Sequence, residues 1–477
     1  MSLPAAKAIL AGLYLFDLYD RRAEARHQQT YRPFPVPPAD RRRFHPADVS
    51  LVVPTVDTDF VVFAACLASW SRCAPGEIIV VATEAQAARV AEFLPGDGDA
   101  STTRVTLLAV ERPNKRHQLI KGIQASRGTI LALVDDDARW ESAETLTSLL
   151  APFEVDDIGL VGGPVDRLTP IFPSQLLPPP ERRDPAVVTP WEVAALRLRA
   201  NRHARMRAAH AADGGINFSV SGATVLARAR LLRDDALFQF EFANERWAGR
   251  RQNAGDDAFL TRWVLFHHLA DDLPAWRRRM VAQLRKDATA AAGTLLGGRY
   301  EDEAVFEQLA KVTELDTRRW RLGVQMTEQA TVPTYLKQGS EFAGQMKRWT
   351  RSGLRLRLTC LLFEPGIVKM YKTAPYMTRK MLECTLAPLL HWLYICSLLI
   401  CLTKAPVLGL SAFVRQFPFA APYWWAAALV DKVQLLSDLY CWATLGTEAW
   451  ETRNTDGDQE GDPLLLVEEI VREGRDA

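Results

Sequence analysis

The chain has 477 residues, more than one small domain needs, and this length predicts two or three structural units. Apolar residues make up 48% and charged residues 24%, as in an ordinary globular protein. The 58 Lys and Arg residues balance 57 Asp and Glu residues, so a net charge of +1 gives no general attraction to nucleic acid. We therefore expect no nucleic-acid partner. The seven cysteines form no Cys-x-x-Cys pair, which favours a reduced, cytosol-facing catalytic part.

Residues 1–48 combine an apolar stretch at 3–16 with a linker at 31–48 that is rich in proline and arginine. The apolar stretch contains Lys7 and is shorter than the ~20 residues that a bilayer span needs. We interpret it as an interfacial or partly inserted helix. A helix of a soluble core is the alternative.

Residues 49–345 have the pattern of one catalytic domain. Continuous apolar runs, typical of buried parallel strands, alternate with helical stretches. The strands are expected at 50–56, 76–83, 104–110 and 129–134, and the helices at 60–73, 84–94 and 115–127. This alternation predicts an α/β fold with a doubly wound, mostly parallel sheet, in which ligands bind at the carboxyl ends of the strands.

The C-terminal part is expected to contact a membrane. Residues 346–380 predict interfacial helices, and 381–446 a transmembrane and interfacial region in which 382–402 is about long enough to span the hydrocarbon core. Basic residues precede that stretch densely, so the catalytic domain should face the cytosol. The stretch at 405–430 is a return span or an interfacial helix. Residues 447–477 form an acidic, mostly disordered tail.

Three carboxylates, Asp135, Asp136 and Asp137, directly follow the strand at 129–134. Asp135 and Asp137 are two residues apart, so their side chains emerge on one side of an extended segment. Such a pair can hold Mg²⁺ or Mn²⁺ while leaving positions open for phosphate oxygens. A solvated strand-to-loop junction is the alternative.

A second acidic pair, Asp256 and Asp257, stands at the expected start of an amphipathic helix. The functional interpretation makes the pair catalytic, with Asp257 as the general base that deprotonates an acceptor hydroxyl. The alternative is a helix cap, because carboxylates are favoured at helix starts.

A third motif is formed by Gln345, Arg348 and Trp349, which share one face if the segment is helical. Arg supplies a fork of donors for a diphosphate, and Trp a flat surface for a sugar ring. A basic and aromatic helix beside a membrane is the alternative.

The order of these motifs resembles the family 2 glycosyltransferases, which include cellulose, chitin and hyaluronan synthases. The resemblance rests on VVPTVD, KRHQLIKGI, LVDDDARW, VGGP, NAGDDAFLTRWV, TEQATVPT and QMKRWTRSGLR, and covers about residues 51–357 closely. It is strongest to a fungal polysaccharide-synthase branch. It implies a GT-A fold, inversion at the anomeric carbon and a requirement for Mn²⁺ or Mg²⁺.

The resemblance also implies roles for single residues. Asp135 and Asp137 match the metal-binding D-x-D pair, and Asp257 the last position of the base motif. Gln345, Arg348 and Trp349 match the Q-x-x-R-W motif that closes over the donor diphosphate.

Further positions are assigned to the donor and the acceptor by the same resemblance. Thr55 and Asp57 occupy the nucleoside-contacting turn, and Lys115 and Arg116 match a Lys-Arg pair near the diphosphate. Ser221 and Gly222 match a small-residue acceptor segment. The acidic pair that usually follows the second strand is missing, and either Glu84 or Thr83 takes its place.

The function expected from these features is that of a membrane-attached hexosyltransferase moving a sugar from a nucleotide diphosphate donor, expected to be a UDP-sugar, onto a growing polysaccharide. It would be an integral membrane protein of the plasma membrane or an internal membrane, with lipid as a further partner. Transfer to a lipid acceptor is one alternative. A catalytically silent nucleotide-sugar-binding scaffold and a metal-dependent phosphohydrolase are the others.

Overall fold

The computed structural model describes most of the chain, namely residues 2–56, 60–94, 103–165, 168–170, 189–199, 202–247, 250–252, 254–266, 319–336, 339–401 and 413–445. Residues 402–412 of the region expected at a membrane and the acidic tail predicted at 447–477 lie outside these ranges.

A seven-stranded mixed sheet forms the centre of the catalytic domain, in the order β10-β5-β7-β4-β1-β2-β3. Its strands are β1 (Val49–Pro54), β2 (Glu77–Thr83), β3 (Arg104–Val110), β4 (Ile130–Val134), β5 (Ile158–Gly162), β7 (Thr224–Arg228) and β10 (Arg321–Val324). All neighbouring strands are parallel except β7, which runs antiparallel to both β4 and β5. The predicted α/β fold with a mostly parallel sheet is confirmed, and so are its first four strands.

Helices cover both faces of the sheet because alternate strand residues point to opposite sides. One face packs against α2 (Phe60–Ser71) and α5 (Thr145–Leu150). The other packs against α4 (Lys115–Ala125), α8 (Ala236–Asn244) and α9 (Asp256–Phe266). In β4, Leu131 and Leu133 face the second layer, whereas Ala132 and Val134 face the first. Strand β4 is apolar throughout because both of its faces are buried.

Shorter elements complete this domain. They are α3 (Glu84–Ala91), the paired strands β6 (Leu168–Pro170) and β11 (Thr334–Leu336), the hairpin β8 (Arg246–Trp247) and β9 (Arg250–Arg251), and the helices α6 (Pro190–Arg199) and α7 (Arg202–Ala212).

The N-terminal helix is longer than expected: α1 spans Leu3–Thr30 rather than 3–16. The linker that follows is irregular apart from two short 3₁₀ turns, and it is held against the sheet. The Tyr31 hydroxyl donates to the carbonyl of Val324 at 2.6 Å, and the backbone N–H of Phe34 donates to Gln325 Oε1 at 2.9 Å.

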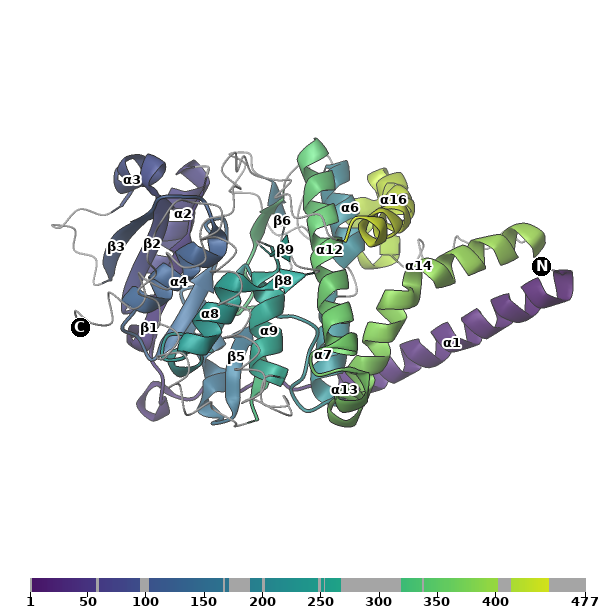
Figure 1. The fold of residues 1–477 in the computed structure, drawn as a ribbon, viewed down its shortest axis with the longest axis horizontal. Helices are drawn as coiled ribbons and strands as arrows, with labels where there is room; N and C mark the ends of the chain where they lie inside the picture. The colour runs from purple at the N-terminus through teal and green to yellow at the C-terminus, as the bar shows by residue number, and fades with distance from the viewer. Residues whose placement is uncertain are drawn as a thin grey trace, which may run out of the picture.

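The C-terminal helices are α12 (Gly339–Leu362), α13 (Ile367–Thr373), α14 (Pro375–Cys401) and α16 (Trp424–Ala443). Figure 1 shows α1 and α14 side by side in an arm that projects away from the sheet. The carboxylate of Asp20 pairs with Arg379 at 2.9 Å and with Lys380 at the base of this arm.

No helix within the described ranges is both long enough and apolar enough to cross a bilayer. The span expected at 382–402 is therefore not confirmed. Helix α14 covers most of that stretch and begins before it, so that it also includes Arg379 and Lys380.

Candidate active site

The order in which the chain adds strands reverses between β1 and β4. From β1 the chain adds β2 and β3 on one side, and then crosses back to place β4 on the other. Polar groups at the carboxyl ends of these two strands lie beside a topological switch point, where ligands of such sheets bind. Thr55 follows β1, and Asp135 follows β4. Parallel pairing of Val52 with Leu133 brings these two ends to the same level.

The three aspartates after β4 have different surroundings. Asp136 is buried and accepts a hydrogen bond of 2.9 Å from the Thr55 hydroxyl. Asp135 and Asp137, on either side of it, are partly exposed. Thr55 thus contacts the acidic motif through its buried middle residue, Asp136. Asp57, two residues after Thr55, lies outside the described residues.

Lys115, the first residue of α4, joins the two acidic motifs. Its Nζ lies 2.8 Å from Asp135 Oδ1 and 2.8 Å from Asp256 Oδ2. Burial of the Lys115 side chain would by itself lower its pKa, but the two carboxylates hold that pKa above its ordinary value. Asp135 and Asp256 are far apart in sequence, so the fold alone brings them to one ammonium group.

The second acidic pair begins α9, as predicted. Burial would raise the pKa of Asp256, but the Lys115 ammonium outweighs it and keeps that pKa below its ordinary value. Burial and the neighbouring Asp256 carboxylate raise the pKa of Asp257 to about 6, against the opposing effects of Lys115 and Arg202. A carboxylate with this pKa is ionised at neutral pH and binds a proton more strongly than an ordinary aspartate, as a general base should.

Gly222, which follows Ser221 in the expected acceptor segment, lies directly against this acidic pair. A Cβ atom placed on Gly222 would be 3.4 Å from Asp257 Cβ and 3.8 Å from Asp256 Oδ2. The same segment touches the first motif, because the Asp135 N–H donates to the Ala223 carbonyl at 3.1 Å. The expected acceptor segment therefore lies between the two acidic motifs.

Helix α12 carries Gln345, Arg348 and Trp349 and packs against α9. A Cβ atom placed on Gly255 would lie 2.8 Å from Ser352 Oγ, one turn beyond Arg348 on the same face of α12. The opposite face packs on α16, with Met346 and Val430 in one apolar cluster. The motif therefore faces the start of α9.

Gln345 carries a buried side-chain oxygen. Its Oε1 atom is buried and accepts no hydrogen bond within the described part of the chain. A buried acceptor without a donor is costly, so this amide oxygen is suited to a ligand hydroxyl.

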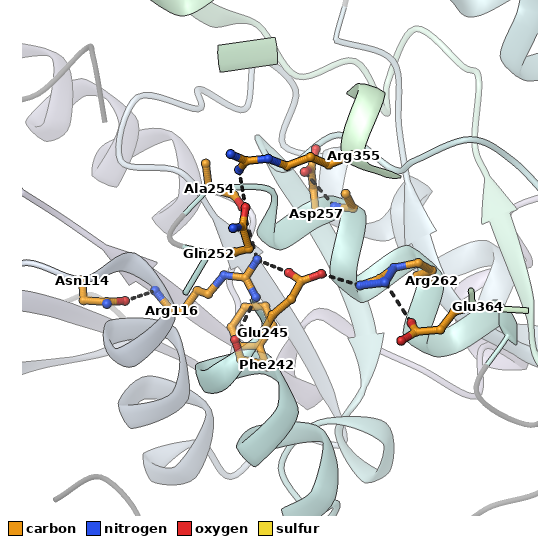
Figure 2. Close-up of polar contacts among 11 residues, drawn as sticks. Asn114, Arg116, Phe242, Glu245, Gln252, Ala254, Asp257, Arg262, Arg355 and Glu364 are labelled. Atoms are coloured by element: carbon orange, nitrogen blue, oxygen red, sulfur yellow. Dashed lines mark hydrogen bonds and ion pairs between the residues drawn. The ribbon is translucent and has the colours of Figure 1, made fainter. Parts of the chain in front are cut away.

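Two residues stand away from this cluster. Glu84, the first residue of α3, is exposed, whereas Thr83 before it is buried at the end of β2. Arg116 is 1% exposed and points into the protein, where it donates to the Phe242 carbonyl and to Glu245 (Figure 2). The expectation that Arg116 lies beside Lys115 at the diphosphate is not supported, because successive helix residues point in different directions.

Sequence reasoning missed several residues that hold the site together. The Gln118 amide donates to the carbonyls of Thr55 and Val81, at 2.9 and 2.8 Å, and so fixes the turn after β1. Gly255 has φ +85°, a conformation that favours glycine, and it turns the chain into α9. The glycine before an acidic pair at a helix start was a visible signal, whereas nothing in the sequence marked Gln118.

The partly exposed carboxylates fit a divalent cation. Asp135 and Asp137 supply hard oxygen ligands at the open end of the sheet, and Mg²⁺ or Mn²⁺ typically uses one or two carboxylates together with substrate phosphates. Among the described residues, no three His, Cys, Asp or Glu side chains are grouped so that they could hold a metal.

Comparison with known proteins supports the family that the motifs resemble. Residues 46–269 match the sequence model of a family described as glycosyltransferase like family 2, and this part of the chain is a family 2 glycosyltransferase domain. The NDP-glycosyltransferase ltbB of Aspergillus luteorubrus is 28% identical over 464 residues, which are 94% of this chain and 98% of that protein. A type 2 glycosyltransferase of Zymoseptoria tritici is 27% identical over 70% of this chain, which spans about half of that longer protein.

Among solved structures, the mannosyltransferase PcManGT from Pyrobaculum calidifontis, in complex with GDP-Man and Mn²⁺, has a TM-score of 0.51. The likeness covers 92% of this chain and 98% of that one at 14% identity, and it supports the GT-A-like fold. The predicted family 2 domain is thus confirmed, whereas the polysaccharide-synthase branch stays a prediction.

Proposed function

We propose that the protein transfers a hexosyl group from a nucleotide diphosphate donor, expected to be a UDP-sugar, to a hydroxyl of a growing polysaccharide. The observation that carries this proposal is the double contact of Lys115. One ammonium lies 2.8 Å from both Asp135 and Asp256, and this supports a reaction centre between the proposed metal-binding motif and the proposed base motif.

The proposed reaction is a single displacement. The acceptor oxygen forms a bond to the anomeric carbon as the bond from that carbon to the donor diphosphate breaks. Asp257 takes the hydroxyl proton, and the nucleoside diphosphate leaves with the bonding electrons. A divalent ion held by Asp135 and Asp137 would supply neutralisation of the diphosphate charge.

Other side chains prepare the donor and the acceptor. Lys115 can turn from its carboxylates to a diphosphate oxygen, and Arg348 can donate to the same leaving group. Gln345 Oε1 accepts a sugar hydroxyl, and Trp349 offers a stacking surface. The acceptor approaches over Ser221 and Gly222, where the missing side chain leaves room beside Asp257.

Membrane attachment is part of the proposal, with the catalytic domain on the cytosolic side of the plasma membrane or an internal membrane. Exposed apolar side chains support it. Trp425, Leu429, Val433 and Leu436 form one stripe along α16, and on α14 Leu389 is 65% exposed. Such surface is costly in water and favourable at a lipid interface.

The test uses membranes from cells that express the full chain, incubated with Mn²⁺ and a panel of radiolabelled UDP- and GDP-sugars. Asp257→Asn is the test variant. Asp157→Asn is the matched control, since Asp157 pairs with Arg321 beside β10, at 2.7 Å.

We expect one donor to label a large, glycosidase-sensitive product, with Asp257→Asn lowering turnover 10²- to 10⁴-fold and Asp157→Asn leaving it unchanged. More than about half of the wild-type turnover in Asp257→Asn would disprove the role of Asp257 as the base. Label confined to a lipid-extractable product would favour the lipid acceptor. Free sugar or phosphate without transfer would favour a hydrolase, and no turnover at all a silent scaffold.

A further inference from the structure

A single carboxylate, that of Glu245, lies between two buried arginines that belong to different helices. Its Oε2 accepts from Arg116 at 2.6 Å and its Oε1 from Arg262 at 2.5 Å (Figure 2). The side chains of Arg116 and Arg262 are 1% and 6% exposed. Two buried cations held by one carboxylate form a unit whose members depend on one another.

This unit connects the two helix starts that carry the site. Arg116 follows Lys115 in the first turn of α4, and it also donates to the carbonyl of Ala254, at 3.2 Å. Ala254 lies two residues before Asp256, and Arg262 lies further along the same helix, α9. Glu245 and Arg116 thus link the first turn of α4 to α9.

The packing around Arg116 makes the connection rigid. Its guanidinium lies 5.0 Å from the ring centroid of Phe242 and 5.6 Å from that of Phe259, and it donates to the Phe242 carbonyl at 2.8 Å. Asn114 Oδ1 caps the same turn by accepting from the N–H groups of Arg116 and His117, at 3.0 and 3.2 Å. A displacement of Arg116 would therefore move the first turn of α4, and Lys115 with it.

We propose that Glu245 is a positioning residue for sugar transfer, which fixes the separation between Lys115 on α4 and the Asp256–Asp257 pair on α9. This inference rests on the proposed function. Glu245 does not itself touch substrate. Its negative charge offsets the repulsion between the guanidinium groups of Arg116 and Arg262. When the carboxylate is neutralised, that repulsion pushes the two side chains apart.

The outer end of the network provides a control. Arg262 also pairs with Glu364 at 2.9 Å, but the Glu364 side chain is 63% exposed and lies in the turn between α12 and α13 (Figure 2). Water can replace an exposed carboxylate of this kind at little cost. Glu364→Gln should therefore change little, although it removes a carboxylate from the same arginine.

A second control separates positioning from stability. Glu77 is a buried carboxylate at the start of β2, whereas the site lies at the carboxyl ends of the strands. It pairs with Arg104 and accepts from the Ser50 hydroxyl at 2.6 Å. Glu77→Gln should lower the melting temperature without changing kcat or the donor KM of the molecules that stay folded.

The experiment compares Glu245→Gln, Glu245→Asp, Glu364→Gln and Glu77→Gln in the full chain. Turnover is expressed per folded molecule, with folding measured by near-UV circular dichroism. Calorimetric binding of UDP and GDP with Mn²⁺ gives donor-site affinity without turnover. We expect Glu245→Gln to raise the donor KM and to lower kcat about 10- to 100-fold, since a misplacement of ~1 Å has effects of that size.

Glu245→Asp keeps the charge but is one methylene shorter, so its kcat and KM should fall between those of the wild type and Glu245→Gln. If Glu245→Gln does not fold, Glu245→Asp decides. Wild-type kcat and KM in a folded Glu245 variant would overturn the inference. So would an activity loss that merely follows the folded fraction, as expected of Glu77→Gln. No turnover by the wild type would instead refute the proposed function, and nucleotide affinity would then decide on Glu245.

Discussion

We predict that turnover at saturating donor rises with pH between 5 and 7, because Asp257 must be ionised to take the acceptor proton. Its pKa is raised to about 6 by burial and by the adjacent Asp256 carboxylate. With that pKa, about 9% of the molecules carry an ionised base at pH 5 and about 91% at pH 7, roughly a ten-fold difference. An aspartate with its ordinary pKa would be more than ~90% ionised at pH 5 and would give an almost flat profile.

The direction in which Lys115 shifts the pKa of Asp257 can be tested with one substitution. Lys115 lowers the pKa of Asp257, so its replacement in Lys115→Met should move the acidic limb to higher pH. Asp256 loses the same cation, and the two carboxylates then share a proton up to a higher pH. The effect on donor binding is separated by measuring kcat rather than kcat/KM.

The assay is initial-rate transfer with a fixed concentration of Mn²⁺, in buffers of constant ionic strength from pH 5 to 8. Asp157→Asn serves as the matched control and should keep the wild-type limb. The reasoning is refuted if wild-type kcat is flat between pH 5 and 7, or if Lys115→Met moves the limb to lower pH.

Three further predictions concern the framework of the site and its metal. Gly255→Ala should lower the free energy of unfolding by about 1–2 kcal/mol, because φ +85° is strained for alanine. Adding Ser352→Ala to this variant should restore little of the lost stability. Denaturant titration measures both effects, and a Gly255→Ala variant as stable as the wild type would contradict the prediction. Thr55→Val should lower the free energy of unfolding by about 1–3 kcal/mol, because it removes the hydroxyl that donates to buried Asp136. Calorimetry should also show weaker donor binding. Unchanged stability and affinity would show that this hydrogen bond is dispensable. Treatment with a chelator should abolish transfer and added Mn²⁺ should restore it; transfer that persists after exhaustive chelation would argue against the cation assigned to Asp135 and Asp137.

The strands and helices of the first half of the domain were predictable because each has a clear local pattern. The apolar run of β4 predicted a strand with both faces buried, and the three carboxylates after it predicted a site at its carboxyl end. Polar Asp256 and Asp257 before an apolar helix predicted the start of α9. These signals are local, since they depend on the period of the secondary structure and on the chemistry of neighbouring residues.

The direction of side chains was not predictable in the same way. Lys115 and Arg116 are adjacent and both basic, yet one joins the two acidic motifs and the other enters an internal network with Glu245. Both side chains carry a positive charge, and it is the turn of the helix that directs them into different surroundings. The length of α1 was also underestimated, because its second half is polar and is held by Asp20 and Glu24 near Lys380 rather than by an apolar face.

The α/β class, the position of both acidic motifs at the ends of secondary-structure elements, and the resemblance to a family of enzymes could all be predicted from the sequence. The folded chain was needed to show that Asp135 and Asp256 meet at Lys115, that Gly222 lies against Asp257, and that Glu245 connects α4 to α9. These contacts join residues far apart in the chain. Their distances follow from strand order and helix packing, whereas sequence patterns report only on neighbours along the chain.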